Sequence, residues 1–337
     1  MNLFFSIIVP VYNRPEEIRE LLESLTAQTY ARPYEIVIVE DGSTLSSKPV
    51  IVEFAHRLPI TYHEKENTGP GNSRNYGMQL AKGNYFIILD SDCILPETYL
   101  EKLQVSLDVD YTDCFGGPDA AHPSFSVVQK AIDHTMTSFL TTGGIRGGKR
   151  SVGKFQPRSF NMGISKEVFE ATGGFGNIHP GEDPDLTFRI WKKGFRSKLI
   201  SDAFVYHKRR IDLKKFYVQV HKFGMVRPIL NKWHPGTARL TYWMPTLFCL
   251  GLLGAILLLF FGIGIFLWLY ILYFGVLFVE VLVKNNDPMI ALYTLVTVMI
   301  QFFGYGYGFL KSVILINLGT KDPQELFPKL FFKRAVA

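Results

Sequence analysis

The chain has 337 residues, of which 47% are hydrophobic and 14% aromatic, and its net charge is +6. The apolar residues are concentrated between Tyr242 and Asn317, which excludes a wholly water-soluble protein and predicts a soluble part followed by a membrane anchor. The basic residues gather at 146–154, at 208–232 and in the last ten residues. Two of these clusters flank the apolar region, so membrane lipids explain the charge better than nucleic acid does.

The three cysteines, Cys93, Cys114 and Cys249, have neither metal-ligand spacing nor an even count. This pattern argues against a disulfide framework and indicates a reducing compartment. The first apolar run stops at Pro10 and no basic region precedes it, so it predicts a strand rather than a signal peptide. We therefore expect the soluble part to stay in the cytoplasm.

The first hundred residues alternate short Ile- and Val-rich runs with stretches of helical periodicity. This alternation predicts βαβ units and an α/β domain with a Rossmann-like mixed sheet, mostly parallel. We expect strands at 4–12, 34–41, 60–64 and 85–89, and helices from residue 15, near 49–57 and at 72–81.

Polar residues follow three of these strands: Tyr12 and Asn13, Glu40 and Asp41, and Asp90 and Asp92. The carboxyl ends of parallel strands converge at the edge of a sheet where ligands bind, so three such groups predict a site there. In an extended chain Asp90 and Asp92 would point to one side, and two like charges that close require a cation or a proton between them. Each residue alone could equally be a helix cap or a turn former.

Beyond Cys114 the pattern loosens, with a helix expected near 125–140. The glycine-rich, basic stretch Gly143–Lys154 predicts a mobile loop, either a connector or a lid over an anionic or lipid-linked substrate. A stripe of apolar residues then predicts either an interfacial helix on the lipid headgroups or a helix packed on the soluble domain. This stripe consists of Ile211, Phe216, Val220, Phe223 and Val226.

Three apolar segments are long enough to cross a bilayer. They lie near 242–261, 263–283 and 288–310, the last extending towards 318. An odd number of passes puts the carboxyl terminus opposite the soluble domain, whereas the basic residues Lys329, Lys333 and Arg334 favour the cytoplasmic side. A split of the third segment at Gly304–Gly308 into a re-entrant or fourth pass would reconcile the two arguments.

Five ordered stretches of this chain resemble the family 2 glycosyltransferases, inverting enzymes with the GT-A fold. The stretches are SIIVPVYNRPEEIRELLESL, IVIVEDGST, NTGPGNSRNYGMQLAKGNYFIILDSD, NMGISKEVFEATGGF and GEDPDLTFRIWKKGF. The resemblance implies a GT-A catalytic domain over residues 1–207. The remaining parts are interfacial helices at 208–241, a transmembrane region at 242–318 and a basic tail at 319–337.

The resemblance implies a nucleotide-sugar donor site and a bound Mn²⁺ or Mg²⁺. Asp41 matches the residue that holds the base, and Glu40 replaces the aspartate that usually precedes it. Asp92 would be the direct metal ligand, because a divalent cation neutralises a diphosphate leaving group. Other implied donor-site residues are Pro10, Tyr12, Arg14, Arg74, Asp90 and Ser91. His207 is implied as a second metal ligand, although a histidine at a strand end is as often merely packed.

The resemblance also implies an acceptor side in GEDPDL, where Asp183 is the general base and Glu182 orients the acceptor. Alternatively, these acids are first-turn residues of a helix, where the helix dipole stabilises their negative charge. The structural and the catalytic role are compatible.

The predicted function is transfer of a sugar from a UDP- or GDP-sugar to a hydroxyl of a lipid-linked or cell-surface glycan, at the cytoplasmic membrane. Alternatives are a polyprenyl-phosphate glycosyltransferase and a non-catalytic membrane scaffold. A processive synthase fits less well, because the chain has VQVHKFGMVRPILNKW where such enzymes carry Gln-x-x-Arg-Trp. The sequence leaves an oligomer open.

Overall fold

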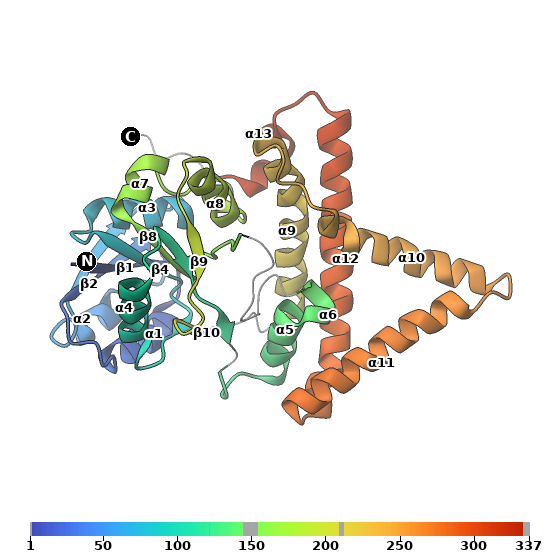
Figure 1. The fold of residues 1–337 in the computed structure, drawn as a ribbon, viewed down its shortest axis with the longest axis horizontal. Helices are drawn as coiled ribbons and strands as arrows, with labels where there is room; N and C mark the ends of the chain where they lie inside the picture. The colour runs from blue at the N-terminus through green and yellow to red at the C-terminus, as the bar shows by residue number, and fades with distance from the viewer. Residues whose placement is uncertain (1, 121, 144–153, 209–211, 333–337) are drawn as a thin grey trace. The chain divides into compact units, whose positions relative to one another are not determined.

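The computed structural model describes residues 2–120, 122–143, 154–208 and 212–332. It forms two compact units, coloured along the chain in Figure 1. The sheet unit comprises Met1–His122, Lys149–Lys208 and Phe331–Ala337, and the helical unit comprises Pro123–Gly148 and Arg209–Leu330. Of the predicted lid Gly143–Lys154, only the two end residues are described, and residues 144–153 lie outside the described part of the chain.

A seven-stranded sheet forms the centre of the sheet unit, with the strand order β3-β2-β1-β4-β8-β6-β9. β1 pairs in parallel with β2 and β4, β2 with β3, and β6 with β9, whereas β8 is antiparallel to β4 and β6. The predicted mixed, mostly parallel sheet is confirmed. The strands are β1 Phe5–Val11, β2 Tyr34–Asp41, β3 Ile60–Lys65, β4 Tyr85–Leu89, β6 Cys114–Gly116, β8 Asn161–Ser165 and β9 Ser197–Leu199.

Helices cover both faces of this sheet, as Figure 1 shows. Successive residues of β1 point to opposite faces, so Ile7 and Val9 pack with Leu21 of α1 while Ile8 packs with Met78 of α3. The first face carries α1 Pro15–Thr26, α2 Lys48–Phe54 and α4 Tyr99–Val109, and the second carries α3 Pro70–Leu80, α7 Lys166–Thr172 and α8 Glu182–Lys192. The apolar face predicted for the first helix is the buried face of α1.

A second, three-stranded sheet in the sheet unit has the order β5-β10-β7. Its strands are β5 Cys93–Ile94, β7 Asp119–Ala120 and β10 Val205–His207. β10 is antiparallel to β5, with His207 opposite Cys93, and the backbone N–H of Lys208 donates to the carbonyl of Asp92 at 3.0 Å. This pairing brings the segment after β4 beside the end of β10.

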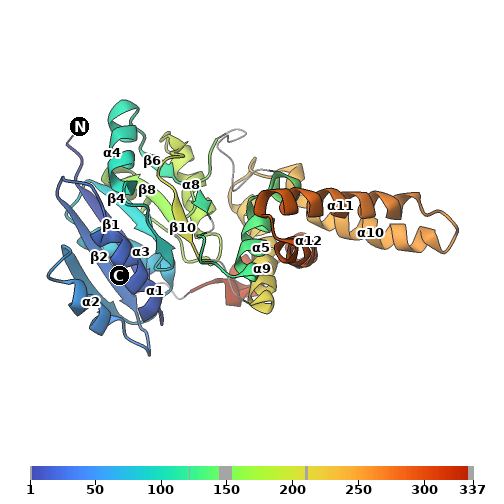
Figure 2. The ribbon, with the colours of Figure 1, turned by 90° about the horizontal axis from the view of Figure 1, so that it is seen from below.

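The helical unit consists of α5 Val127–Thr137, α6 Phe139–Thr142, α9 Leu213–Trp233, η1 Leu240–Trp243, α10 Met244–Leu259, α11 Ile265–Asn285, α12 Pro288–Leu318, α13 Pro323–Leu326 and η2 Pro328–Leu330. α9 lies beside α12, and α10 and α11 form a hairpin that projects to one side of α12 (Figures 1 and 2). Phe216 and Val220 of the predicted apolar stripe pack with Ile132 of α5, whereas Ile211 lies outside the described residues.

Three helical stretches are long and apolar enough to cross a membrane: Leu240–Leu259, Ile265–Asn285 and Pro288–Leu318. They correspond to the three predicted apolar segments. The third is one unbroken α-helix of 31 residues that runs through Gly304 and Gly308, so the predicted split there is not observed.

Candidate active site

Arg74 on α3 joins two carboxylates from different elements. Its Nη2 lies 2.7 Å from Oδ1 of Asp90, which follows β4, and its Nη1 lies 3.1 Å from Oε1 of Glu182, the first residue of α8. The Arg74 guanidinium also lies over the Phe175 ring, 5.2 Å from its centroid. With both terminal nitrogens paired and only 3% of its side chain exposed, Arg74 lies beneath the site and fixes its parts.

Glu182 is likewise an internal residue. Its side chain is 5% exposed, and its Oε1 lies 3.0 Å from Nδ1 of His179 as well as near Arg74. Burial would raise the pKa of Glu182, but His179 and then Arg74 outweigh it and lower that pKa to about 2. Glu182 therefore stays charged and holds the start of α8 to Arg74.

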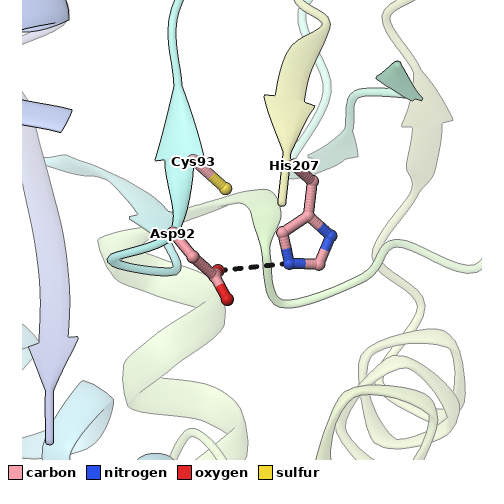
Figure 3. Close-up of side chains that lie close together, drawn as sticks. All are labelled: Asp92, Cys93 and His207. Carbon is pink, nitrogen blue, oxygen red and sulfur yellow. Dashed lines mark ion pairs between the residues drawn. The ribbon is translucent and has the colours of Figure 1, made fainter. Parts of the chain in front are cut away.

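Asp92 is the second acidic group at this edge of the sheet, and Figure 3 shows it facing the ring of His207. Its Oδ1 lies 3.2 Å from Nε2 of His207, and Nη1 of Arg14 contacts its Oδ2. Burial would raise the pKa of the Asp92 carboxyl, but His207 and Arg14 outweigh it and hold that pKa well below its usual range. Asp92 is thus an ionised, buried carboxylate beside a histidine.

The ring of His207 is held in place from two sides. It stacks on Phe160, with centroids 4.7 Å apart and an interplanar angle of 14°. Its Nδ1 lies 4.0 Å from Oδ2 of Asp119, whose side chain is 3% exposed. The Asp119 carboxylate is within ion-pair range of the far nitrogen but beyond hydrogen-bond distance, while Nε2 faces Asp92.

Cys93 completes the group of Asp92, Cys93 and His207, whose candidate ligand atoms all lie within 4.8 Å of one another (Figure 3). Burial raises the pKa of its thiol well above the usual range, so the sulfur stays protonated. Its Sγ donates to the carbonyl of Phe160 at 3.4 Å. The ionised oxygen and the ring nitrogen are therefore better cation ligands than this thiol.

The expectation that Asp90 and Asp92 lie on an extended chain is wrong. β4 ends at Leu89, and the chain turns at Ser91 and Asp92 instead of remaining extended. The carboxylates consequently have different partners, Arg74 for Asp90 and Arg14 with His207 for Asp92. Each carboxylate thus has its own close partner, although Arg14 also interacts electrostatically with Asp90.

Asp41 caps the turn that precedes α3. Its Oδ1 accepts the backbone N–H of Thr68 and its Oδ2 that of Gly69, both at 3.0 Å, and Lys65 also contacts Oδ1. Asp41 is 3% exposed. Asp41, which the resemblance assigns to binding of the nucleotide base, thus also fixes the loop at Thr68 and Gly69.

Glu40, where the related enzymes usually have aspartate, is buried at the end of β2. Its Oε2 accepts the backbone N–H of Ser47 at 2.8 Å and the hydroxyl of Tyr62 at 3.0 Å, and its Oε1 accepts the hydroxyl of Ser43. The longer side chain therefore ties the loop after β2 to β3.

The loops after β1 and β2 are joined by Asn13, which has a positive φ of 53°. Its Oδ1 accepts the backbone N–H groups of Thr44 and Leu45 at 2.8 and 2.9 Å. Among the other implied donor-site residues, Tyr12 is 50% exposed, Pro10 is half-buried and Ser91 is buried. Tyr12 is thus the one with the largest surface open to a ligand.

Asp183 lies one residue into α8, with Gly181 at the N-cap. Its Oδ2 lies 3.5 Å from Nη1 of Arg158, and the two side chains are 16% and 15% exposed. Asp183 therefore has a more open side chain than its neighbour Glu182, which faces Arg74.

Sequence reasoning missed Arg158, Phe160, His179 and the role of Cys93. Arg158 and Phe160 lie outside the quoted stretches, and His179 stands two positions before GEDPDL. These residues reach the site through tertiary packing, so no local spacing marks them.

The comparisons with known proteins agree with this fold. The family described as Glycosyl transferase family 2 matches residues 6–170. The glycosyltransferase GlyG of Streptococcus pneumoniae is 35% identical over 221 residues, which are 62% of this chain and 72% of that protein. A Haemophilus influenzae protein named an uncharacterized glycosyltransferase is 44% identical over 102 residues, 30% of this chain; the match spans only 33% of that relative.

Among solved structures, the mannosyltransferase PcManGT from Pyrobaculum calidifontis, in complex with GDP-Man and Mn²⁺, has a TM-score of 0.58. It is 17% identical and the match covers 92% of this chain and 88% of that one. The sheet unit has a GT-A-type fold. The chain belongs to glycosyltransferase family 2.

Proposed function

We propose that this protein is an inverting glycosyltransferase that uses a nucleoside-diphosphate sugar, a UDP- or GDP-sugar, and a hydroxyl of a lipid-linked or cell-surface glycan. The acceptor oxygen attacks the anomeric carbon, the bond from that carbon to the diphosphate oxygen breaks, and the nucleoside diphosphate leaves with the bonding electrons. The acceptor proton passes to the Asp183 carboxylate. The single observation that carries this proposal is the juxtaposition of Asp90, Arg74 and Glu182, which ties a donor-side strand end to the helix that bears Asp183.

The residues beside β5 fit a divalent cation. The Oδ1 atom of Asp92 is buried and accepts no hydrogen bond of good geometry from the described residues, while Nε2 of His207 lies 3.2 Å away. Adjacent ligands of an octahedral cation, each bound at about 2.1 Å, lie about 3 Å apart, which is close to this spacing. Asp92 and His207 would hold Mn²⁺ or Mg²⁺, which supplies charge neutralisation for the diphosphate leaving group.

The donor base would lie at the loops after β1 and β2. Asp41 and Asn13 shape these loops, and Tyr12 offers an exposed ring beside them. A nucleotide bound there would direct its diphosphate towards Asp92. The Pyrobaculum protein of this fold holds GDP-Man and Mn²⁺, which is the class of ligands we propose.

A second acceptor class is favoured by one observation. Arg158 lies 3.5 Å from Asp183 and would place a cation beside an acceptor phosphate, as in a polyprenyl-phosphate glycosyltransferase. A phosphate is already ionised and needs no general base, so the two classes differ in their dependence on Asp183. The long apolar helices suit a lipid-linked acceptor in either case.

The test is a panel of nucleotide-sugars, offered with Mn²⁺ to the detergent-purified protein, with hydrolysis, transfer and binding measured. We expect Asp183→Asn to abolish transfer to a hydroxyl and to leave donor affinity within about twofold, because Asp183 acts on the acceptor. Asp202→Asn, an exposed change of the same chemistry, is the matched control. Full transfer by Asp183→Asn to a polyprenyl phosphate would favour the second class, and absence of binding by every donor would favour a non-catalytic scaffold.

A further inference from the structure

Phe331 and Phe332 follow η2 and pack within the sheet unit. Phe331 forms an antiparallel bridge with Ile178. The backbone N–H of Phe332 donates to the carbonyl of Asn177 at 3.0 Å, and the Asn177 side chain donates back to the Phe332 carbonyl at 3.3 Å. The bridge and these hydrogen bonds fix this segment against the loop that precedes α8.

The ring of Phe332 rests directly on Gly69. A Cβ placed on Gly69 would overlap the ring, and Gly69 has a φ of +90°, so glycine is needed on both grounds. The N–H of Gly69 donates to Asp41 at 3.0 Å. The ring therefore packs on the turn that Asp41 caps, on the donor side of the site.

The same ring faces His179, with the two centroids 5.9 Å apart. His179 lies 3.0 Å from Glu182, which pairs with Arg74. Phe332 thus contacts both loops that lead into the helices of the site: the turn before α3 and the loop before α8. None of the five quoted family stretches includes it.

We propose that Phe332 is a positioning residue that holds the donor-side turn at Gly69 against the acceptor-side loop at Asn177–His179. This inference rests on the proposed function for its consequence in catalysis. If both loops are fixed before substrate binds, less conformational entropy is lost on binding. The bound donor and the general base Asp183 also keep a constant relative position. Its loss is expected to weaken donor binding and to slow turnover together.

The test compares Phe332→Ala with Phe332→Tyr, which keeps a ring, and with Phe139→Ala, which removes a ring that is 74% exposed. UDP and GDP, each with Mn²⁺, are the calorimetric probes, and hydrogen exchange of residues 66–70 and 177–179 reports the two loops. We expect Phe332→Ala to weaken binding of the recognised nucleotide about tenfold and to speed exchange in both loops. We expect both control variants to stay within about twofold of the wild type.

Unchanged exchange and unchanged affinity in Phe332→Ala would overturn this role. If neither nucleotide binds the wild type, the donor assignment fails, and the exchange comparison alone decides whether Phe332 holds the two loops. Failure of the proposed function and failure of this inference thus give different results.

A second observation concerns α12. Gly224 of α9 has no room for a Cβ beside the carbonyl of Tyr305, and Gly308 has none beside the carbonyl of His221, so the two helices touch backbone to backbone. α9 carries Lys214, Lys215, Lys222, Arg227 and Lys232, and α12 carries Lys311. A bilayer that enclosed the middle of α12 would also enclose charged residues of α9, which hydrocarbon disfavours.

The hairpin of α10 and α11 is more apolar, and its two charged residues, Glu280 and Lys284, lie near the carboxyl end of α11. α10 has no charged residue, and only 17% and 11% of the apolar windows of the two helices are buried, against 44% for α12. The hairpin projects sideways from α12 in both ribbon views (Figures 1 and 2). A hairpin that crosses the bilayer therefore leaves α12 close to the membrane plane.

We infer that α10 and α11 cross the membrane and that α12 lies with α9 among the headgroups. Two crossings return the chain to its starting side, as the packing of Phe331 and Phe332 on the sheet unit requires. This resolves the conflict between an odd number of passes and a basic carboxyl end.

The test places single cysteines in a cysteine-free chain at four exposed positions and labels sealed vesicles of both orientations with a membrane-impermeant maleimide. The changes are Val109→Cys, Phe261→Cys, Lys284→Cys and Lys321→Cys. We expect the cysteines at positions 109, 284 and 321 to be labelled from one side of the membrane and the cysteine at 261 from the other. If the cysteine at position 321 is labelled from the side opposite to the one at 284, α12 crosses the membrane. If the cysteine at 261 is labelled from the same side as the one at 109, the hairpin does not cross.

Discussion

Nη1 of Arg74 lies 3.1 Å from Oε1 of Glu182, and both side chains are almost completely buried. The pair connects α3, which starts at the turn capped by Asp41, to α8, which carries Asp183. A buried ion pair contributes little net stability, but removing one partner leaves an uncompensated charge and costs about 3 to 5 kcal/mol. The pair is therefore a sensitive point for both the stability and the geometry of the site.

The first prediction is that Glu182→Gln destabilises the protein in a pH-dependent way. The pKa of Glu182 is lowered from 4.5 to about 2 in the folded chain. Its stabilising contribution is then fully present above the unfolded pKa of 4.5 and is lost as the pH falls towards 2. We expect a loss of about 3 kcal/mol in the free energy of unfolding at pH 7, shrinking below pH 4.5.

This prediction is checked by chemical unfolding of the purified full chain in detergent at pH 7 and between pH 5 and 3. The quantity of interest is the difference between wild type and variant, because other acids titrate equally in both. Glu66→Gln, at an exposed position, serves as the control. A difference that stays constant down to pH 3 would contradict the assignment.

A second prediction concerns Glu40, which occupies a position where the related glycosyltransferases usually have aspartate. Its longer side chain reaches the N–H of Ser47 and the hydroxyl of Tyr62. Glu40→Asp shortens the side chain by one methylene and breaks at least one of these buried bonds, so we expect a loss of about 1 to 3 kcal/mol. The thermal midpoint of unfolding should fall accordingly. An unchanged midpoint would mean that the loop adapts to the shorter residue.

Much of the sheet unit was predictable because strand and helix periods are local properties. The runs 34–41 and 85–89 coincide with β2 and β4, and the apolar residues of 15–26 form the buried face of α1. The candidate site was predictable in outline for the same reason: Asp41 ends β2, and Asp90 and Asp92 follow β4, so these acids flank the end of β1, which lies between the two strands.

What sequence reasoning could not supply are the partners of each charge. An extended chain predicts that Asp90 and Asp92 share a cation, but the chain turns at Ser91. Asp92 pairs with Arg14, 78 residues away, and Asp90 pairs with Arg74 on the preceding helix. Phe332 is separated from Gly69 by most of the chain, so only the folded structure brings them together. Long-range pairing of this kind leaves no periodic signal.

A third prediction uses the buried thiols of the sheet unit. Burial raises the pKa of Cys93 and of Cys114 well above the usual range, and both residues are fully buried. Because the thiolate is the reacting form, we expect neither to react with a water-soluble maleimide at pH 8 in the folded chain. Both should react once the chain is unfolded in guanidinium. Rapid modification of Cys93 before unfolding, detected by mass spectrometry of the peptide, would show that the region beside Asp92 opens.

The last prediction distinguishes two members of the cluster in Figure 3, His207 and Cys93, by the effect of their replacement on Mn²⁺ affinity. His207→Ala removes a nitrogen that lies 3.2 Å from Asp92, so we expect Mn²⁺ affinity in the presence of the recognised nucleotide to fall about tenfold or more. Cys93→Ser keeps a donor for the carbonyl of Phe160 and should leave that affinity within about twofold, because the protonated thiol is no ligand. His56→Ala, at an exposed histidine, controls for the loss of an imidazole elsewhere. Electron paramagnetic resonance of free Mn²⁺ measures all three, and equal affinity in His207→Ala and the wild type would remove His207 from the metal site.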